Sequence, residues 1–380
     1  MPLSAVVACR IEQAAGRVLR ENVRADSDFP AFDRVMMDGY GLRWRDWQAG
    51  HRTFRVTGSA RAGQPMASLA GEAATCLEIM TGAPCPHGAD AIVPVEAVTR
   101  LTSTAVTFAE SGAPLAGRFI HRAGSDVLAG EILLVPGTLL GSRQIGVAAA
   151  CGAGFLQVSA LPEIAVIATG DELVAVDETP APHQIRQSNA HSLAAALTLA
   201  GYPPSEVGVL NDDVSQARPV FKRLLASHDW LVLTGAVSMG ARDFVPSLLA
   251  ALGCREIFHG VAHRPGKPAG CWLGPEGQVI LALPGNPVSA LTGLHVFLLP
   301  ALATASGLTV PPQRRLVLDD RSHALVDFTR HLPVRIGVDG TAEPAATGNS
   351  GDFIGLLKSD GFITLPPRGE GAAFPFTPWR

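Results

Sequence analysis

The sequence of 380 residues lacks the features that mark several classes of protein. Its six cysteines include no pair at the C-x-x-C spacing, so neither a zinc site of that kind nor a disulfide framework is indicated. We therefore expect free thiols in a reducing compartment. The net charge of −4 excludes the broadly basic surface that nucleic acid requires. Any anionic ligand must be held by a few local cations and backbone amides.

Apolar residues make up 47% of the chain, yet an unbroken apolar run of about 20 residues is missing. The uncharged stretch from Gly277 to Gln313 contains Pro284, Pro287 and Pro300, which we expect to break it into pieces. The apolar segment at the N-terminus is too short for a signal peptide. These absences predict a cytoplasmic protein with no membrane or nucleic-acid partner.

Common nucleotide-binding motifs are also missing. The glycine-rich segment from Leu233 to Phe244, LTGAVSMGARDF, matches neither the Walker A spacing nor G-x-G-x-x-G. Dinucleotide oxidoreduction is therefore disfavoured. The backbone N–H groups of this loop, with the start of the following helix, instead indicate an anion cradle. Its candidate residues are Gly235, Ser238 and Asp243.

The chain divides into three regions of different pattern. Residues 1–160 combine a predicted helix at Ile11–Val23 with short β-branched strands such as Phe54–Thr57. Residues 161–305 alternate strands with helices, which is typical of a three-layer α/β domain on a mostly parallel sheet. The remaining residues predict a small β domain.

The α/β region carries the clearest element signals. Strands are predicted at 164–168, 207–210, 230–233 and 279–283, and helices at 189–200, 214–226, 244–252 and from 288 onward. Asn189 is the expected N-cap of the first of these helices. Ligands of such sheets bind beyond the carboxyl ends of the strands, where this chain places its glycine-rich segments.

Carboxylates follow two of these strands. ATGDEL, residues 168–173, runs from a strand into Thr-Gly and two acidic residues, a pattern that suits a phosphate with a divalent cation beside it. The same pattern is equally ordinary as a helix-capping turn. Asp212 and Asp213 follow the next strand and place more carboxylates at the same edge.

Two later segments, HGVAHRPGKP and LPGNPVSA, supply positive charge and a helix start. His259 and His263 are four residues apart, but their surroundings indicate strand and loop, so a metal site is not favoured. Arg264 and Lys267 on a proline-stiffened turn can hold a tetrahedral oxyanion. Ser289, in the first turn of the next helix, is another anion donor.

Two segments near the N-terminus complete the set. FPAFDRVMMDGYG exposes Asp33 and Asp38, and IMTGAP presents Thr81; each alone could be an ordinary turn. In order, FDRVMMDGYG, IMTGAP, ATGDEL, GAVSMGARDF, RPGKP and LPGNPVSA resemble the molybdopterin molybdenumtransferase (MoeA) family, which is related to the E domain of gephyrin.

The resemblance implies a MoeA-like α/β multidomain fold and a homodimer with a shared active site. Its expected parts are an elongated N-terminal domain (1–39 and 112–160), an inserted β-rich domain (40–111), a three-layer α/β molybdopterin-binding domain (161–305) and a C-terminal β-barrel (306–380). By motif, the catalytic positions are Asp38, Thr81, Glu172, Asp212 and Asp243. The cofactor-binding positions are Gly235, Ser238, Arg264, Lys267, Pro284, Pro287, Ser289 and Arg330.

The implied activity is insertion of molybdate into adenylylated molybdopterin with release of AMP. Mg²⁺ would be held near Glu172, Asp212 and Asp243 and would polarise the pyrophosphate. Expected partners include the molybdopterin adenylyltransferase and downstream molybdoenzymes. The alternative is a pterin-binding paralogue that acts as a carrier without efficient metal insertion; nothing in the sequence indicates a structural scaffold.

This sequence departs from the family pattern at several positions. Ala236 replaces a glycine, Arg264 replaces a lysine and Asp352 replaces a serine expected to reach the molybdate site. A carboxylate beside an oxyanion is unfavourable unless a cation intervenes. We therefore expect Arg330 to neutralise Asp352.

Overall fold

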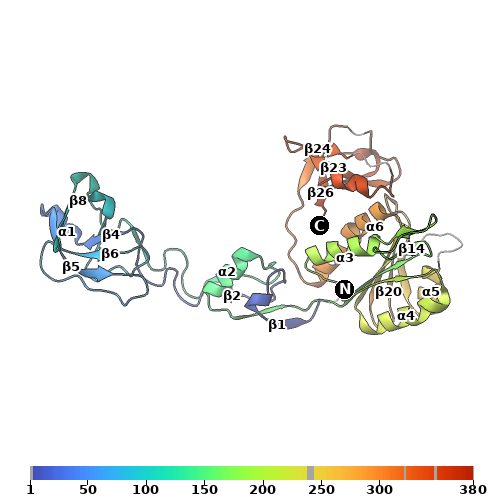
Figure 1. Cartoon of the computed structure of the whole chain (residues 1–380), viewed down its shortest axis with the longest axis horizontal. Coiled ribbons are helices and arrows are strands. Elements are labelled where there is room, and N and C mark those ends of the chain that lie inside the picture. The colour runs from blue at the N-terminus through green and yellow to red at the C-terminus, as the bar shows by residue number, and fades with distance from the viewer. Residues whose placement is uncertain (1–2, 238–243, 321, 346–348, 380) are drawn as a thin grey trace. The chain divides into compact units, whose positions relative to one another are not determined.

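The structure is a computed structural model that describes residues 3–237, 244–320, 322–345 and 349–379 (Figure 1). Its internal contacts divide the chain into two compact units. The larger unit comprises Met1–Arg20, Pro136–Ser142 and Phe155–Arg380, and the smaller unit comprises Glu21–Val135 and Arg143–Gly154. The four-domain division expected from the family remains a prediction.

A six-stranded sheet in the order β7-β4-β6-β5-β9-β8 dominates the smaller unit. Its strands are β4 (Gly39–Leu42), β5 (Thr53–Ala60), β6 (Thr75–Ile79), β7 (Ala91–Pro94), β8 (Val98–Leu101) and β9 (Ala105–Phe108). Only β5 and β6 run parallel among these pairs. The strand predicted at Phe54–Thr57 lies within β5 and is confirmed. Phe54 and Phe108 pack in the core of this sheet.

Short elements make up the rest of the N-terminal half. They are β1 (Val6–Arg10) with β12 (Phe155–Ser159), β2 (Val23–Arg24) with β11 (Ile132–Leu134), β3 (Arg34–Val35) with β10 (Ile120–His121), α1 (Trp44–Gln48) and α2 (Ser142–Ala150).

The helix expected at Ile11–Val23 is wrong. Only a single 3₁₀ turn, Ile11–Gln13, forms there. Gly16 adopts a left-handed φ of 79°, which turns the chain away from a helical path. Leu19 then bridges to Val158 in β12. Val18 and Leu19 are buried, and both bridge to residues far along the chain, which the local sequence pattern does not reveal.

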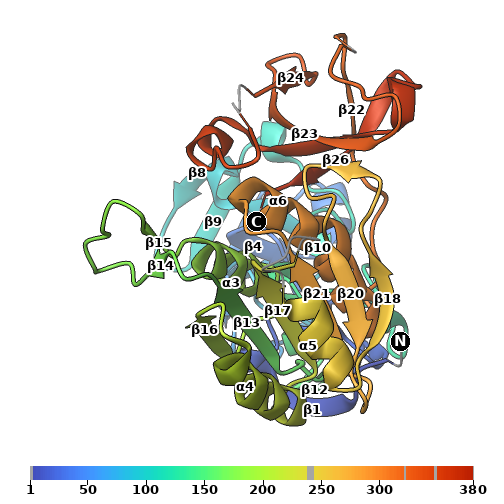
Figure 2. The same cartoon turned by 90° about the vertical axis from the view of Figure 1, so that its right-hand side faces the viewer.

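The α/β sheet in the larger unit has the order β16-β13-β17-β21-β20-β18, and Figure 2 shows these strands side by side. Its strands are β13 (Ile164–Thr169), β16 (Glu206–Leu210), β17 (Trp230–Thr234), β18 (Arg255–His259), β20 (Gly270–Leu273) and β21 (Val279–Leu283). The first four in the sheet order are parallel, and β20 is antiparallel to both of its neighbours, β21 and β18. The mostly parallel sheet is confirmed.

Helices cover both faces of this sheet. They are α3 (Asn189–Leu199), α4 (Val214–Ser227), α5 (Val245–Ala251), α6 (Pro287–Gly293) and α7 (Leu299–Ala305). Alternate residues of β13 belong to two hydrophobic cores, one on each face of the sheet. Val166 packs with α3 and α6, and Ile167 packs with α4 and α5. This alternation arises because successive side chains of a strand point to opposite faces. The expected three-layer arrangement is confirmed.

Pro300 does not break the uncharged stretch as expected. Pro287–Ala305 forms 19 continuous helical residues, in which a π-helical turn, Leu294–Leu298, directly precedes α7. Such a turn can absorb the clash and the missing N–H of a proline. This segment is long and apolar enough to cross a membrane by length and composition, but 67% of its most apolar window is buried within the fold, as in a core helix.

The C-terminal sheet has the order β19-β23-β25-β26-β22, with β24 also paired to β23. Its strands are β19 (His263–Arg264), β22 (Arg315–Val317), β23 (Thr329–Ile336), β24 (Ala342–Pro344), β25 (Gly361–Leu365) and β26 (Ala373–Pro378). The expected β region is confirmed. One strand, β19, comes from the HGVAHRPGKP segment and pairs in parallel with β23, so a strand that follows the α/β sheet is part of the C-terminal sheet.

Two buried histidines join β19 to β23 and predict a pH-dependent stability. His331 Nε2 lies 3.1 Å from His263 Nδ1, and burial together with His263 lowers the pKa of His331 to about 4. In the unfolded chain the His331 imidazole is protonated below a pH of about 6.5, whereas in the folded chain it stays neutral down to a pH of about 4. Stability should therefore fall by roughly 3 kcal/mol between those two pH values.

Urea unfolding of the parent and of His331→Gln at several pH values would measure this loss. The parent should weaken more steeply on acidification than His331→Gln, whereas His183→Gln, at an exposed histidine, should follow the parent. Equal slopes for the parent and His331→Gln would contradict the assignment.

Candidate functional site

A cavity of about 620 Å³ lies beyond the carboxyl ends of β13, β17 and β21. Thr169 ends β13, Gly235 follows β17 and Pro284 follows β21, so the parallel sheet brings all three to one edge. Among the predicted site residues, those that line the cavity are Glu172, Asp212, Gly235, Pro284 and Pro287. Ser289 is buried in α6 and is not among the lining residues.

The four carboxylates at this edge divide into two kinds. Asp171 Oδ1 accepts the N–H of Asp212 at 3.0 Å, and Asp213 Oδ1 accepts the N–H of Ser215 at 2.8 Å and caps α4. These two hold the loops in place. Glu172 and Asp212 line the cavity.

The two lining carboxylates fit a magnesium ion. Mg²⁺ is usually held by one or two carboxylates, with substrate phosphates and water completing its coordination. In the described part of the chain, no group of three His, Cys, Asp or Glu side chains is placed to hold a metal by itself. Asp243, the third predicted ligand, lies outside the described residues.

The glycine-rich loop begins with two left-handed residues. A side chain at Gly235, whose φ is 99°, would overlap the carbonyl oxygen of Thr169, so only glycine fits. Ala236 follows with a φ of 46°, which explains why the family pattern has glycine there. Ser238, like Asp243, falls outside the described residues.

The left-handed alanine gives a stability prediction. Because the Cβ of an L residue is strained in this conformation, Ala236→Gly should stabilise the protein by about 1 kcal/mol. Ala195→Gly, at an exposed position within α3, should destabilise it by roughly the same amount. The denaturant midpoints of the two variants and the parent would measure these changes in stability. A loss of stability in both variants would contradict the conformational explanation.

Three cations gather where β19 meets β23. Arg264 lies opposite Arg330 in the parallel register. The Arg264 guanidinium is 5.2 Å from the centre of the Phe328 ring, and Lys267 Nζ is 5.9 Å from it. Among the described residues, none of the three cations forms an ion pair with a carboxylate. Pro268, which follows Lys267, lines the cavity, so this positive cluster borders it.

Asp352 does not pair with Arg330, so that expectation is wrong. Arg330 Nη1 instead donates to the carbonyl of His323 at 2.7 Å, and its partial burial lowers its pKa. Asp352 Oδ1 accepts the N–H of Gly355 at 2.9 Å, at the start of a 3₁₀ turn, Ile354–Lys358. A carboxylate suits this place because it satisfies an otherwise free backbone donor.

Two asparagines hold the loops at the rim of the cavity together by hydrogen bonds. Sequence reasoning did not single out either of them as a site residue. Asn189 is not the N-cap; Ser188 holds that position, and the Asn189 amide donates to Thr234 Oγ1 at 3.1 Å and to Gly285 O at 2.7 Å. Asn286 donates to Ser350 Oγ at 2.9 Å. The PGNP signal marked this loop, but no local pattern could identify the partners of these amides.

The smaller unit holds the remaining predicted pair. Asp38 Oδ1 accepts the N–H of Thr81 at 2.7 Å and its hydroxyl at 2.8 Å. These bonds lower the pKa of Asp38, which is therefore ionised at neutral pH. Asp33, by contrast, has a structural role, because it accepts the N–H of Ala123 at 2.9 Å.

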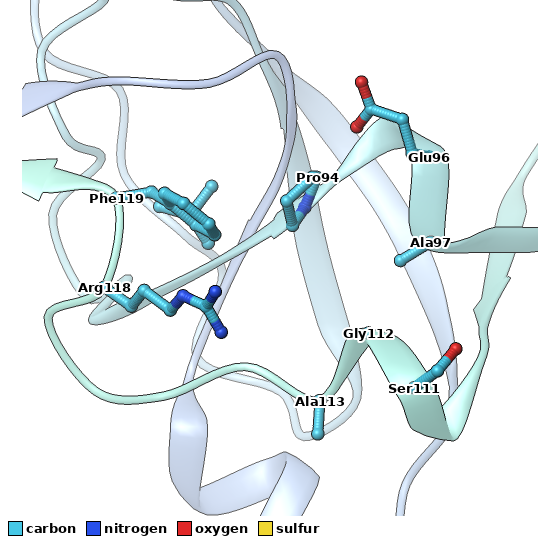
Figure 3. A pocket seen from close by; sticks show the side chains of 9 residues that line it. Pro94, Glu96, Ala97, Ser111, Gly112, Ala113, Arg118 and Phe119 are labelled. Atoms are coloured by element: carbon cyan, nitrogen blue, oxygen red, sulfur yellow. The ribbon is translucent and has the colours of Figure 1, made fainter.

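A second, smaller cavity of about 270 Å³ lies in this unit (Figure 3). Figure 3 shows Arg118 and Phe119 on one side of it and Ala97 on the other. The guanidinium of Arg118 stacks 4.7 Å from the centre of the Phe119 ring. Val95, next to the lining residues Pro94 and Glu96, donates its N–H to the carbonyl of Asp38 at 3.0 Å.

Two family models match most of the chain. One, the MoeA N-terminal region (domain I and II), matches residues 2–152, and the other, a probable molybdopterin binding domain, matches residues 165–304. The second match covers the lining residues of the larger cavity except Gly351. The matched segments therefore include Asp38 and Thr81 as well as Glu172 and Asp212.

Named relatives and a solved structure agree with these models. A molybdopterin molybdenumtransferase from Synechocystis sp. is 34% identical over 378 residues, which span 97% of this chain and 94% of that protein. Molybdopterin molybdenumtransferase 2 from Mycobacterium tuberculosis is 37% identical over 82% of this chain and 80% of its own length. The crystal structure of a molybdopterin biosynthesis MoeA protein from Pyrococcus horikosii has a TM-score of 0.75 at 27% identity and covers 100% of this chain and 95% of that one. The chain therefore belongs to the MoeA family.

Proposed function

We propose that this protein is a molybdopterin molybdenumtransferase, which inserts molybdate into adenylylated molybdopterin and releases AMP. The observation that carries the proposal is one cavity that has two carboxylates, Glu172 and Asp212, at the ends of parallel strands and a cationic turn at its border. The substrate carries a pyrophosphate, and the second substrate is a tetrahedral oxyanion. The carboxylates can hold a divalent cation against the pyrophosphate, and the cationic turn can hold the oxyanion.

The residues divide the work by charge. Glu172 and Asp212 would hold Mg²⁺ against the pyrophosphate, where the ion supplies Lewis-acid polarisation of the bond that breaks. Backbone N–H groups of the loop that starts at Gly235 would hold phosphate oxygens. Arg264, Lys267 and Arg330 would hold molybdate while its oxo groups are exchanged for the two dithiolate sulfurs. The displaced oxo groups leave as water with the protons of the two thiols. A water molecule attacks a phosphorus of the pyrophosphate, which releases AMP and leaves the other phosphate on the pterin, so the reaction needs no protein nucleophile.

The active site is proposed to be shared in a homodimer. Asp38 and Thr81 belong to the smaller unit, whereas Glu172 and Lys267 belong to the larger unit. In this proposal the partner subunit supplies the Asp38 region to the cavity. Sedimentation should show a dimer at micromolar concentration; a strictly monomeric protein would contradict the shared site but not the ligand class.

The cellular setting follows from the chemistry. We propose a cytoplasmic protein that receives its substrate from the molybdopterin adenylyltransferase and delivers the metallated cofactor to molybdoenzymes. The alternative, a pterin carrier, rested on the departures at Ala236 and Asp352 and on a lysine of the family pattern that is missing after the glycine-rich loop. It is not favoured, because the Asp352 carboxylate accepts a backbone hydrogen bond and the relatives above are named for metal transfer.

Incubation with adenylylated molybdopterin, Mg²⁺ and molybdate tests the proposal. AMP should appear in the presence of the protein and Mg²⁺, and chromatography can follow it. Tight binding of the pterin without any AMP release would support the carrier instead.

A further inference from the structure

Two buried polar side chains with no role in the proposed chemistry line the cavity of the larger unit. Gln187 lies between the short strand β15 (Ile185–Arg186) and α3, and the residue is only 3% exposed. Neither its Nε2 nor its Oε1 has a hydrogen-bond partner in the described part of the chain. Thr169, which is 4% exposed, likewise has an unpartnered Oγ1. Both residues line the same cavity.

An unpartnered buried amide is unfavourable for the protein alone. Nearly all buried polar groups in folded proteins have partners, and each exception requires an explanation. Methionine would fill a similar volume at this position with no unsatisfied polar atom. The backbone does not explain the glutamine, because its N–H already donates to the carbonyl of Val174 at 2.9 Å. The side-chain amide is therefore held ready for a partner that is not part of this chain.

We propose that Gln187 is a specificity-determining residue that reads the hydrogen-bonding edge of the heterocycle bound in this cavity. A carboxamide presents one acceptor and one donor side by side. It matches a ring edge that places a donor next to an acceptor, as adenine does with its 6-amino group and a ring nitrogen. The lactam edge of a pterin, N3–H beside O4, has the same complementarity. The inference rests on the proposed function, because adenylylated molybdopterin carries both rings.

Neighbouring side chains do not compete for this role. The amide of Asn189 is already used by Thr234 and Gly285, and the guanidinium of exposed Arg186 donates to the carbonyl of Glu178 at 3.1 Å. Gln184, in the loop that leads into β15, accepts the N–H of Ala181 at 3.1 Å and is not a lining residue. Gln184 therefore offers a matched control for the same chemical change outside the cavity.

Calorimetry with AMP and with neopterin as separate probes tests the proposal on the parent, Gln187→Met and Gln184→Met. Gln187→Met should weaken binding of at least one probe about tenfold or more, while Gln184→Met binds both like the parent. The melting temperature of ligand-free Gln187→Met should rise, because the variant no longer buries an unpartnered amide. A purely structural glutamine would give the opposite shift.

Gln187→Glu then distinguishes the two rings. A carboxylate only accepts hydrogen bonds, so it suits the adjacent N3–H and 2-amino donors of a pterin and repels the ring nitrogen acceptor of adenine. If Gln187→Glu binds neopterin as well as the parent or better, Gln187 contacts the pterin ring. If Gln187→Met loses affinity for AMP but not for neopterin, Gln187 contacts adenine.

The outcomes that overturn the inference differ from failure of the proposed function. Unchanged affinity for both probes in Gln187→Met would overturn the inference alone. So would a loss of affinity accompanied by a lower melting temperature, which would make the role structural. A parent protein that binds neither AMP nor neopterin would contradict the proposed function as well.

Discussion

Replacing Glu172 by alanine is expected to lower the rate of AMP release from adenylylated molybdopterin about a hundredfold or more. Glu172 is a lining carboxylate of the cavity, whereas the neighbouring Asp171 carboxylate holds the backbone of Asp212. The change therefore removes a proposed Mg²⁺ ligand with little effect on the loop. Rates measured over a range of Mg²⁺ concentrations would check it.

Two further variants make this test specific. Glu172→Gln keeps the shape but not the charge, so it should be nearly as slow and should require more Mg²⁺. Glu178→Ala removes a carboxylate from the loop that leads into β15, at a position that does not line the cavity, and it should retain the parental rate. If Glu172→Ala retains parental activity at saturating Mg²⁺, the metal-site assignment is wrong.

Lys267→Ala is expected to raise the molybdate concentration required for half-maximal metal insertion by about tenfold or more. The Lys267 ammonium lies with Arg264 on the Phe328 ring, and among the described residues no carboxylate neutralises either cation. Loss of one charge should weaken oxyanion binding while pterin binding is preserved. Molybdate titrations of metal insertion would measure the shift.

Lys222→Ala is the matched control, because Lys222 is exposed on α4, away from the cationic cluster. It should leave the molybdate dependence unchanged. If Lys267→Ala behaves like Lys222→Ala, the cationic turn does not bind molybdate. A parallel loss of pterin affinity would instead indicate that the turn serves the larger substrate.

The sequence predicted the α/β sheet well because its central strands are buried on both faces. Ile164–Thr169 and Val279–Leu283 are short apolar runs near Gly and Pro. This pattern is typical of a strand that is buried on both faces of a parallel sheet. The motif loops then follow from topology, since the carboxyl ends of parallel strands meet at one edge. Glu172, Asp212, Gly235 and Pro284 accordingly line one cavity, as expected.

The misses share a different cause. Leu19, in the segment from Ile11, bridges to a strand more than a hundred residues away, and Pro300 stays helical because a π-helical turn precedes it. Asp352 caps a short turn, although its chemistry suggested a cation as partner. In each case a tertiary or backbone contact decides the outcome, and the local sequence contains no signal for it.

Gln187 shows the same limit within the site. Its sequence neighbours form no recognisable motif, and its significance comes from burial without a hydrogen-bond partner. Only the three-dimensional arrangement reveals such a side chain, because the pairing of every nearby donor and acceptor must be known. Sequence patterns thus pointed to the carboxylates that line the cavity, Glu172 and Asp212, but not to the neutral amide that we propose reads the ligand.

The most direct test of the central claim is the ratio of molybdenum incorporated to AMP released. The protein would be incubated in excess over adenylylated molybdopterin with Mg²⁺ and molybdate, and the metal content of the isolated pterin would be measured beside the AMP. The account predicts equal amounts of the two products, with both lost in Glu172→Ala. AMP release without metal in the pterin, or metal insertion that survives in Glu172→Ala, would contradict it.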